Sequence, residues 1–499
     1  MIAPFSAGRL SGRSAFGTTA RDTVPPPAAA RLGPGPVFGG GLLAGGALLG
    51  VFLGLAGCAP QEELRALDKI QPAVEAGDSH AVGAGVAISR ELSRPMAGDR
   101  NVRSMIARAL TSQDAVSEAA GKVEALLDNV RVAKAGYYPS VSVGVSSGIG
   151  DYGDDDDPAL TLTGTQMLYD FGKVDRTVAK SAIAVRSQHL KFLNAVDGLI
   201  VDVVQNYSDL RQYREQEAVT FEQLEKMKEI EEMISSRLSE GLSDSSDLLE
   251  VRKRAQSAEA SYLKTKVELA RAQRGLGTLA GSASLRTAGE VPGLPQACAS
   301  GVIWPEAVPD VQIAHLEKAA AELALRDASK ARMPVLSLQG KAIQPFDGND
   351  EDQRLGLNLD LSSTIFQGGS QGAQKAAAEK SLRSADAAVA ARRQDAELTF
   401  SNAVDEARNL AVVEEALAKQ VDYLDEMRVL YRSQFIDLGT RRLIDLLDTE
   451  EEYYQTRLDL VSTRYQIESA QITCLESGGR LRQNFGLEDK TLHGLALKP

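Results

Sequence analysis

Residues 355–372 read LGLNLDLSSTIFQGGSQG. Leu alternates with Gly, Asn or Asp over residues 355–361, which predicts a β-strand with one apolar and one polar face. Phe366 and the glycines after it interrupt that alternation, and residues 371–436 contain no proline that would break a helix. The stretch therefore predicts a strand that leads into a helix far longer than a compact domain needs.

The same succession occurs in the first half of the chain. Residues 160–163 alternate apolar and polar side chains, an aromatic-glycine stretch interrupts them, and residues 173–238 read as another long helix. Corresponding landmarks in the two halves lie about 200 residues apart, which indicates a duplicated structural unit. The landmark pairs are Pro139 with Pro334, Tyr169 with Phe366, Gly241 with Gly439, and Asp247 with Asp445.

Each copy is expected to hold two strands joined by an acidic loop, a long helix, a glycine turn and a returning helix. The first copy is predicted as a helix at 101–135, a strand at 138–145, a strand that begins at 160 and ends at Tyr169, and helices at 173–238 and 247–278. The second copy is predicted as strands at 335–340 and 355–361, and helices at 371–436 and 443–475. A helix of about 65 residues is ~100 Å long, so its apolar stripe must pack on similar helices. Residues beyond Gly478 are expected to be loosely ordered.

The bulk composition excludes some classes of partner. The chain has 499 residues, a net charge of −13 and a pI near 5.1, so nucleic acid is not expected as a partner. No polybasic stretch suggests binding to an anionic membrane surface. Ala, Leu and Val supply most of the 43% hydrophobic content, as in packed long helices.

The N-terminal segment has the pattern of an export signal. Arginines precede the uncharged residues 40–56, and Leu-Ala-Gly-Cys at 55–58 resembles a bacterial lipobox. Residues 1–57 are therefore predicted to be a signal peptide, with Cys58 as the lipidated first residue. Ala59 follows the cysteine; lipoprotein families that stay in the inner membrane have Asp there, so Ala59 favours the outer membrane. A retained transmembrane helix is the alternative.

Two further cysteines lie far apart in the sequence. Cys298 lies in the Pro- and Gly-rich linker between the copies, and Cys474 lies near the end of the last long helix. In a doubled fold these two segments meet at the same level, and an exported protein folds in an oxidising compartment. A disulfide between them is predicted; two unrelated buried thiols are the alternative.

The number of strands implies an oligomer. Strands of ~9–11 residues span a bilayer when tilted, but an open sheet edge in lipid leaves backbone groups unpaired. The smallest usual membrane barrel has ~8 strands, and the chain supplies four. Two copies give a barrel filled by side chains, whereas three leave a water-filled lumen. The fold class is therefore mainly α with a transmembrane β-barrel completed by several chains. A soluble β-hairpin domain that caps a coiled coil is the alternative.

Several motifs together resemble the TolC family of outer-membrane channels over almost the whole mature chain. They are KAGYYP at 134–139, LYDFGK at 168–173, IFQGG at 365–369 and LGTRRLIDLLD at 438–448, of which the last is the most specific. The resemblance implies a homotrimer with a 12-strand β-barrel in outer-membrane lipid, continuous with a 12-helix periplasmic α-barrel. It also implies docking on a periplasmic adaptor (membrane fusion) protein and on an inner-membrane transporter, either ABC-type or proton-driven.

The resemblance also implies a gate at the helix tips. In this family coiled tips close the tube, and Arg441 is expected to latch them by bonding to Asp247 and Ser246. Asp445 and Asp448 match the family's acidic constriction and share one helix face. A solvated, merely polar tip is the alternative for these charges.

The adaptor is expected to dock on the same tips, where glycines allow close approach. The implied docking residues are Arg237, Leu238, Gly241, Leu242 and Ser243 in the first copy, and Phe435, Leu438, Gly439 and Thr440 in the second. The implied divisions of the chain are a signal peptide (1–57), an N-terminal segment (58–100), a first repeat (101–290), a linker (291–308), a second repeat (309–480) and a tail (481–499).

Signals of catalysis are weak. Residues 368–372 match G-x-S-x-G between a strand and a helix, but the only downstream histidine is His493 in the tail. The four histidines are scattered, so no zinc site, no other metal site and no cofactor is expected. The acidic loops at 151–157 and 347–352 are expected at the extracellular mouth, either as plain hydrophilic loop tips or as a weak Ca²⁺ site.

These observations predict an export conduit without catalysis of its own. A protein secreted through a type I system is the expected cargo, because of the residues that flank the turn at Gly439. Small toxic molecules carried by a multidrug pump are the alternative. A periplasmic coiled-coil lipoprotein with a purely structural role is the alternative from another class.

Overall fold

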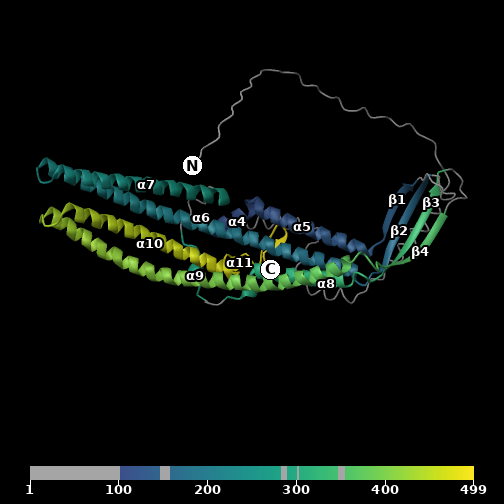
Figure 1. Ribbon diagram of the computed structural model, residues 1–499. Coiled ribbons are helices and arrows are strands. Elements are labelled where there is room, and N and C mark those ends of the chain that lie inside the picture. Colours follow the sequence, from purple (N-terminus) through teal and green to yellow (C-terminus); the bar gives the residue numbers. More distant parts are fainter. Residues whose placement is uncertain (1–101, 147–157, 282–288, 300–302, 347–353) are drawn as a thin grey trace, which may run out of the picture. The chain divides into compact units, whose positions relative to one another are not determined.

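The computed structural model describes residues 102–146, 158–281, 289–299, 303–346 and 354–499 (Figure 1). The expected signal peptide, Cys58, the segment up to residue 100 and both acidic loops lie outside the described residues.

Two copies of one unit follow each other in the described chain. The first consists of α4 (Val102–Ser112), α5 (Asp114–Lys134), η1 (Ala135–Tyr137), β1 (Ser140–Ser146), β2 (Ala159–Tyr169), α6 (Lys173–Ser239) and α7 (Ser245–Ala280). A linker with η3 (Leu294–Gln296) and η4 (Pro305–Ala307) follows. The second consists of α8 (Pro309–Ser329), β3 (Val335–Pro345), β4 (Arg354–Ser362), α9 (Ser370–Ile436) and α10 (Leu443–Ser477). The predicted duplication and the mainly α fold class are confirmed.

The single helix predicted at 101–135 is two helices. Gln113 separates α4 from α5 with extended backbone angles (φ −90°, ψ 124°). Its side-chain amide donates to the carbonyl oxygens of Thr278 and Leu279 at the end of α7. The helix axis can therefore change direction at Gln113, and the two hydrogen bonds fix this position against the end of α7.

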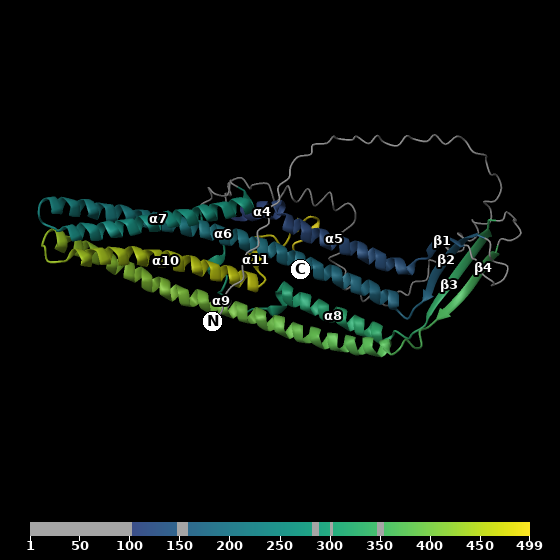
Figure 2. The ribbon, with the colours of Figure 1, turned by 45° about the horizontal axis from the view of Figure 1, so that its top comes forward.

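The long helices pair as hairpins. α6 and α9 have 67 residues each, and they pack along α7 and α10 respectively. α10 also packs on α6, so the two hairpins lie side by side in both views (Figures 1 and 2). A buried stripe that includes Val196, Ile200, Val203 and Tyr207 runs along α6, as its apolar spacing predicts.

The four long strands form one antiparallel sheet in the order β1-β2-β3-β4. The β2–β3 pair joins the two copies, with Gly164 opposite Gly340. β2 continues to Tyr169, where the aromatic-glycine stretch was predicted to end the strand, with an irregularity between Met167 and Tyr169.

The C-terminal tail is ordered, so the expectation of a loose tail is wrong. It contains α11 (Leu481–Asn484), β5 (Thr491–Leu492) and β6 (Leu495–Ala496). Five apolar side chains of this tail are buried in the largest core cluster, with residues of α4, α5 and α6. They are Leu481, Phe485, Leu487, Leu492 and Leu497. Short elements between glycine turns have no long periodicity, and so the sequence pattern misses them.

Of the helices in the described residues, none is both long enough and apolar enough to cross a membrane.

Candidate functional site

Cross-strand pairing gives the sheet one apolar and one polar face. Directly paired residues share a face, and the register aligns the apolar positions of all four strands. The Val and Leu residues on this apolar face are Val141, Val143, Val145, Leu160, Leu162, Leu336, Leu338, Leu355, Leu357, Leu359 and Leu361. The opposite face carries mainly Ser, Thr, Gln, Asn, Asp and Lys, among them Thr163, Lys341 and Asp360.

The apolar face is uncovered in the single chain. Val143 is 68% exposed, Leu359 66% and Leu357 60%. A contiguous exposed apolar surface of this kind marks an interaction surface, either with lipid or with protein. The sheet thus has the alternation of a membrane barrel wall, with lipid on one side and water on the other.

The sheet is open at both sides. β1 and β4 are its edge strands, and each has a hydrogen-bonded neighbour on one side only within the described residues. In lipid each unpaired backbone group costs several kcal/mol, so both edges require partner strands.

The aromatic-glycine stretches turn each strand into its long helix. In the first copy Phe171 (φ 55°) and Gly172 (φ 75°) have left-handed backbone angles. The Asp170 carboxylate accepts hydrogen bonds from the backbone N–H groups of Gly172 (2.9 Å) and Val174 (2.7 Å), which satisfies the free donors at the start of α6. Tyr169 packs edge-on against Phe171.

The first helix tip joins α6 to α7 through a Schellman motif. The Leu242 N–H donates to the Arg237 carbonyl (2.8 Å), and the Gly241 N–H donates to the Leu238 carbonyl (3.1 Å). Gly241 has φ 75°, which a side chain would strain. Asp244 then caps α7 by accepting from the N–H groups of Ser246 and Asp247.

The second tip joins α9 to α10 through a wider turn. The Thr440 N–H donates to the Gln434 carbonyl (3.0 Å), and Gly439 has φ 62°. The Arg441 Nε donates to the Gln434 side-chain oxygen (3.0 Å), and its guanidinium lies 4.0 Å from the centre of the Tyr431 ring. Arg441 therefore fastens the turn to the last residues of α9.

The bonds implied for Arg441 are not formed within one chain. The Ser246 hydroxyl contacts Asp244, and no hydrogen bond or ion pair joins Arg441 to Ser246 or Asp247 in the described chain. Within its own hairpin, Arg441 instead contacts Tyr431 and Gln434. The latch that the resemblance implies for Arg441, Asp247 and Ser246 therefore stays a prediction for the assembled tube.

Both carboxylates of the expected constriction have an arginine partner. Asp445 accepts from Arg442 (2.7 Å), and this pairing lowers the pKa of Asp445. Asp448 accepts from Arg254 of α7 (2.8 Å), which also contacts Glu250 and Glu451. The two hairpins are thereby joined by ion pairs close to their tips.

The implied docking residues are unequally accessible. Leu242 and Leu438 are 61% and 66% exposed at the two turns, beside exposed Gly241, Gly439 and Thr440. Arg237, Leu238 and Ser243 are partly buried.

Phe435 differs from the other implied docking residues because it is buried. It lies in a core formed by both hairpins, with Ile234, Val251 and Leu446 among its members. The Arg237 guanidinium lies 5.1 Å from the centre of its ring. Phe435 therefore supports the tip from inside rather than offering a surface to a partner.

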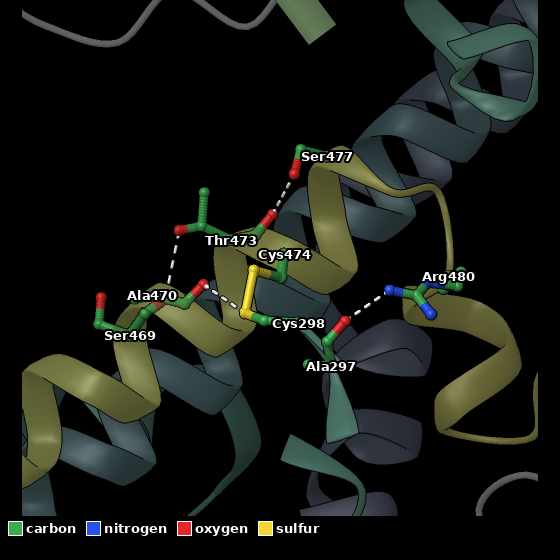
Figure 3. The surroundings of a disulfide bond; sticks show 8 residues. All are labelled: Ala297, Cys298, Ser469, Ala470, Thr473, Cys474, Ser477 and Arg480. Atoms are coloured by element: carbon green, nitrogen blue, oxygen red, sulfur yellow. Dashed lines mark hydrogen bonds between the residues drawn. A yellow bond between two sulfur atoms is a disulfide. The ribbon is translucent and has the colours of Figure 1, made fainter. Parts of the chain in front are cut away.

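Cys298 and Cys474 are joined by a disulfide bond in the structure, with their Cα atoms 5.5 Å apart (Figure 3). The bond connects the linker after η3 to the last turns of α10. Arg480, which follows α10, donates a hydrogen bond to the carbonyl oxygen of Ala297, next to Cys298 (Figure 3). The linker is therefore attached to the end of α10 by this hydrogen bond as well as by the disulfide. The linker between the repeats is thus tied to the second repeat near the tail.

A buried ion pair that the sequence pattern did not reveal holds the tail. The Arg482 side chain is 4% exposed, and its Nε lies 3.1 Å from Oδ1 of Asp197 on α6. Burial raises the pKa of Asp197 to about 7 despite the attraction of Arg482, and Glu476 adds to the rise. Asp197 lies among the buried apolar residues of α6, and a carboxylate at such a position was the sequence signal that could have indicated a buried ion pair.

We expect the Asp197 carboxyl to make stability depend on pH. Its pKa is about 7 in the folded state against an ordinary 3.8, so the folded chain holds a proton that the unfolded chain releases. The resulting stabilisation is complete below pH ~4 and is lost as the pH rises through about 7. The melting temperature should fall less between pH 5 and pH 8 for Asp197→Asn than for the wild type. Asp202→Asn, at an exposed position of α6, should match the wild type; equal losses in all three proteins contradict the assignment.

The serine motif has no catalytic surroundings. Ser370 is the first residue of α9, and its hydroxyl contacts the side-chain oxygen of Gln367 (3.2 Å). His493 contacts Ser117 instead (3.3 Å). In the part of the chain that the structure describes, no three His, Cys, Asp or Glu side chains gather as metal ligands would.

Comparison with known proteins agrees with the geometry. Residues 105–282 match the family described as outer membrane efflux protein. Nodulation protein T from Rhizobium leguminosarum bv. viciae is 26% identical over 156 residues, a match that spans 30% of this chain and 32% of that relative's length.

Solved structures share the fold. The outer membrane protein VceC from Vibrio cholerae superposes with a TM-score of 0.67 at 16% identity, over 76% of this chain and 96% of that one. A membrane protein from Pseudomonas aeruginosa gives a TM-score of 0.67 at 20% identity, over 75% and 89% of the two chains. The predicted resemblance is confirmed: residues 105–282 match the outer membrane efflux protein family, and the chain shares the fold of these solved outer-membrane and membrane proteins.

Proposed function

We propose that the protein is the outer-membrane channel of a tripartite export system. The observation that carries the proposal is the four-stranded sheet with one apolar face, one polar face and two open edges. Three copies supply twelve strands, which close the edges around a water-filled lumen. The long hairpins continue this tube into the periplasm, where their tips meet a periplasmic adaptor and an inner-membrane transporter.

Conductance tests the proposal directly. Purified protein inserted into a planar lipid bilayer should give discrete conductance steps, because the polar sheet face lines a continuous aqueous path. A structural lipoprotein that serves only as a periplasmic spacer gives no steps. Absence of steps, with insertion verified by protease protection, would overturn the channel.

The tips are proposed to form the gate, with Arg441 as its main fastening. Removing the guanidinium removes the Gln434 hydrogen bond and the Tyr431 stacking at the turn. Arg441→Ala is therefore expected to raise resting conductance severalfold in the bilayer assay. Arg271→Ala, which removes an exposed pair with Glu268 on α7, serves as the control and should leave conductance unchanged. An Arg441→Ala channel as closed as the control contradicts this gate.

Two cargo classes remain for the channel. The tip sequence, with Gln434-Phe435 before the turn and Asp445 to Asp448 after it, favours a protein secreted by a type I system. The family description as efflux proteins favours small molecules. Deletion of the gene followed by a drug-susceptibility assay and by analysis of the secreted proteins separates the two, since each cargo affects only one readout.

The N-terminal anchor belongs to the same proposal. Signal cleavage before Cys58 and acylation of its thiol would fix the mature start of each copy in the membrane. Mass spectrometry of the membrane-extracted protein tests this through the mass of the N-terminal peptide.

A further inference from the structure

A surface cavity lies where the sheet meets the helices. It has a volume of about 420 Å³ and lies between the start of α6, the end of α8, the start of β3 and the end of β4. Val335 and Ser362, which line it, are cross-strand partners on the polar face of the sheet. Cavities of this size hold small molecules or the polar part of larger ones.

The cavity is basic although the whole chain is acidic. Lys173, Arg176 and Lys330 contribute to its lining, together with the carboxylates of Asp170 and Asp327. Both carboxylates are already engaged by the protein. Asp170 caps α6, and Asp327 forms ion pairs with Arg176 and Lys180.

The two lysines are left as free cations. Neither Lys173 nor Lys330 forms a hydrogen bond or an ion pair through its ammonium group with any residue of the described ranges. Both are exposed, so their ammonium groups can turn toward a ligand in the cavity. Arg176, with its side chain 11% exposed, also lines the cavity, but its charge is balanced by the ion pair with Asp327.

Hydroxyl groups complete the lining. Ser362 ends β4, Ser363 and Thr364 follow it, and Thr177 lies one turn into α6. The hydroxyl groups of Ser363 and Thr177 donate to the backbone carbonyls of Arg332 and Lys173, which leaves those of Ser362 and Thr364 as donors to a ligand. Ammonium groups together with hydroxyl donors form the usual environment of a phosphate group in proteins, since each of its oxygens accepts several hydrogen bonds. A carboxylate ligand has fewer oxygen atoms than a phosphate and therefore accepts fewer hydrogen bonds from these donors.

We propose that this cavity binds a phosphate group through Lys173 and Lys330. The group belongs either to a phospholipid headgroup at the membrane boundary or to a soluble molecule in the channel. The location given to either ligand rests on the proposed function, whereas the binding itself requires only the folded chain and can be measured separately from conduction.

Two probes distinguish the sources. The full-length protein, purified in detergent and freed of lipid, is titrated with glycerol 3-phosphate by calorimetry, and with phosphatidylglycerol by native mass spectrometry. Binding of glycerol 3-phosphate identifies a soluble ligand. Binding of phosphatidylglycerol alone identifies a lipid headgroup.

Substitution of the lysines tests the assignment. The double variant Lys173→Gln with Lys330→Gln should lower the affinity for the probe about tenfold or more, because two charge-assisted contacts are lost. Lys173→Arg with Lys330→Arg should keep most of the affinity. Lys375→Gln, on α9 and outside the cavity lining, is the control for the loss of a surface lysine elsewhere. Circular dichroism verifies the fold of each variant.

The proposal is overturned if neither probe binds the wild type, or if the double Gln variant binds as well as Lys375→Gln does. Conductance of the same preparations is recorded in parallel. A conducting channel without binding refutes the site alone, whereas binding without conductance refutes the channel alone.

Discussion

Leu357→Lys is expected to prevent the protein from assembling in the outer membrane. Leu357 lies in the middle of β4 on the apolar face, opposite Gly340 of β3, and is 60% exposed in the single chain. A Lys on the lipid face of a barrel costs about 2–4 kcal/mol near the bilayer midplane. Each copy in the assembly bears this cost, so the amount of oligomer extracted from membranes should fall by about tenfold or more.

Asn358→Lys is the matched control, since it adds the same charge one residue further along. Asn358 pairs with Gln339 on the polar face. On that face a lysine meets water, so the extracted amount of oligomer should stay close to that of the wild type. Quantitative immunoblotting of membrane fractions measures both. Equal losses for the two variants, or none for either, would contradict the assignment of faces.

Removal of the disulfide is expected to have the second large effect. The Cys298–Cys474 bond closes a loop with a sequence separation of 176 residues. In the chain-entropy model, a loop of this length corresponds to about 5 kcal/mol of stabilisation through the unfolded state. Cys298→Ser with Cys474→Ser should therefore lower the free energy of unfolding by an amount of this order, measured by denaturant titration in detergent.

Reduction of the wild type provides the control for this prediction. The wild type under reducing conditions should match the double variant, whereas the double variant should not respond to reductant. Peptide mapping without reductant should find the two cysteines in one cross-linked fragment. A wild type whose stability is unchanged by reduction would contradict the role assigned to the bond.

The duplicated architecture was predictable because it repeats one strong local signal. The strand at residues 355–361 and the long uninterrupted helices have clear periods, and the predicted ends of the long helices lie within a few residues of the observed ones. Gly241 and Gly439 were identifiable as turns because each turn requires a left-handed residue.

The features that the sequence missed depend on tertiary contacts. Gln113 interrupts a helix because of its bonds to the end of α7, which lies far away in the sequence. The tail is ordered because Arg482 finds Asp197 and because its leucines fill the core of the first repeat. No pattern within a short stretch records such partners.

The candidate functional site likewise includes features that the sequence predicted and features that depend on tertiary contacts. The two faces of the sheet were visible in the alternation of residues, and the observed register aligned them. The contacts of Arg441 with Tyr431 and Gln434 were not visible, because they depend on how the turn at Gly439 folds back on the end of α9. The arginines that pair with Asp445 and Asp448 likewise depend on how the hairpins approach each other.

The number of chains in the membrane-extracted particle tests the central claim most directly, because a sheet with two open edges must be completed by other copies. Single-particle electron microscopy of the detergent-purified protein shows the number of copies and their symmetry together. The account predicts three chains around one axis with a continuous lumen. A particle that contains one chain and remains stable and folded in detergent would contradict it.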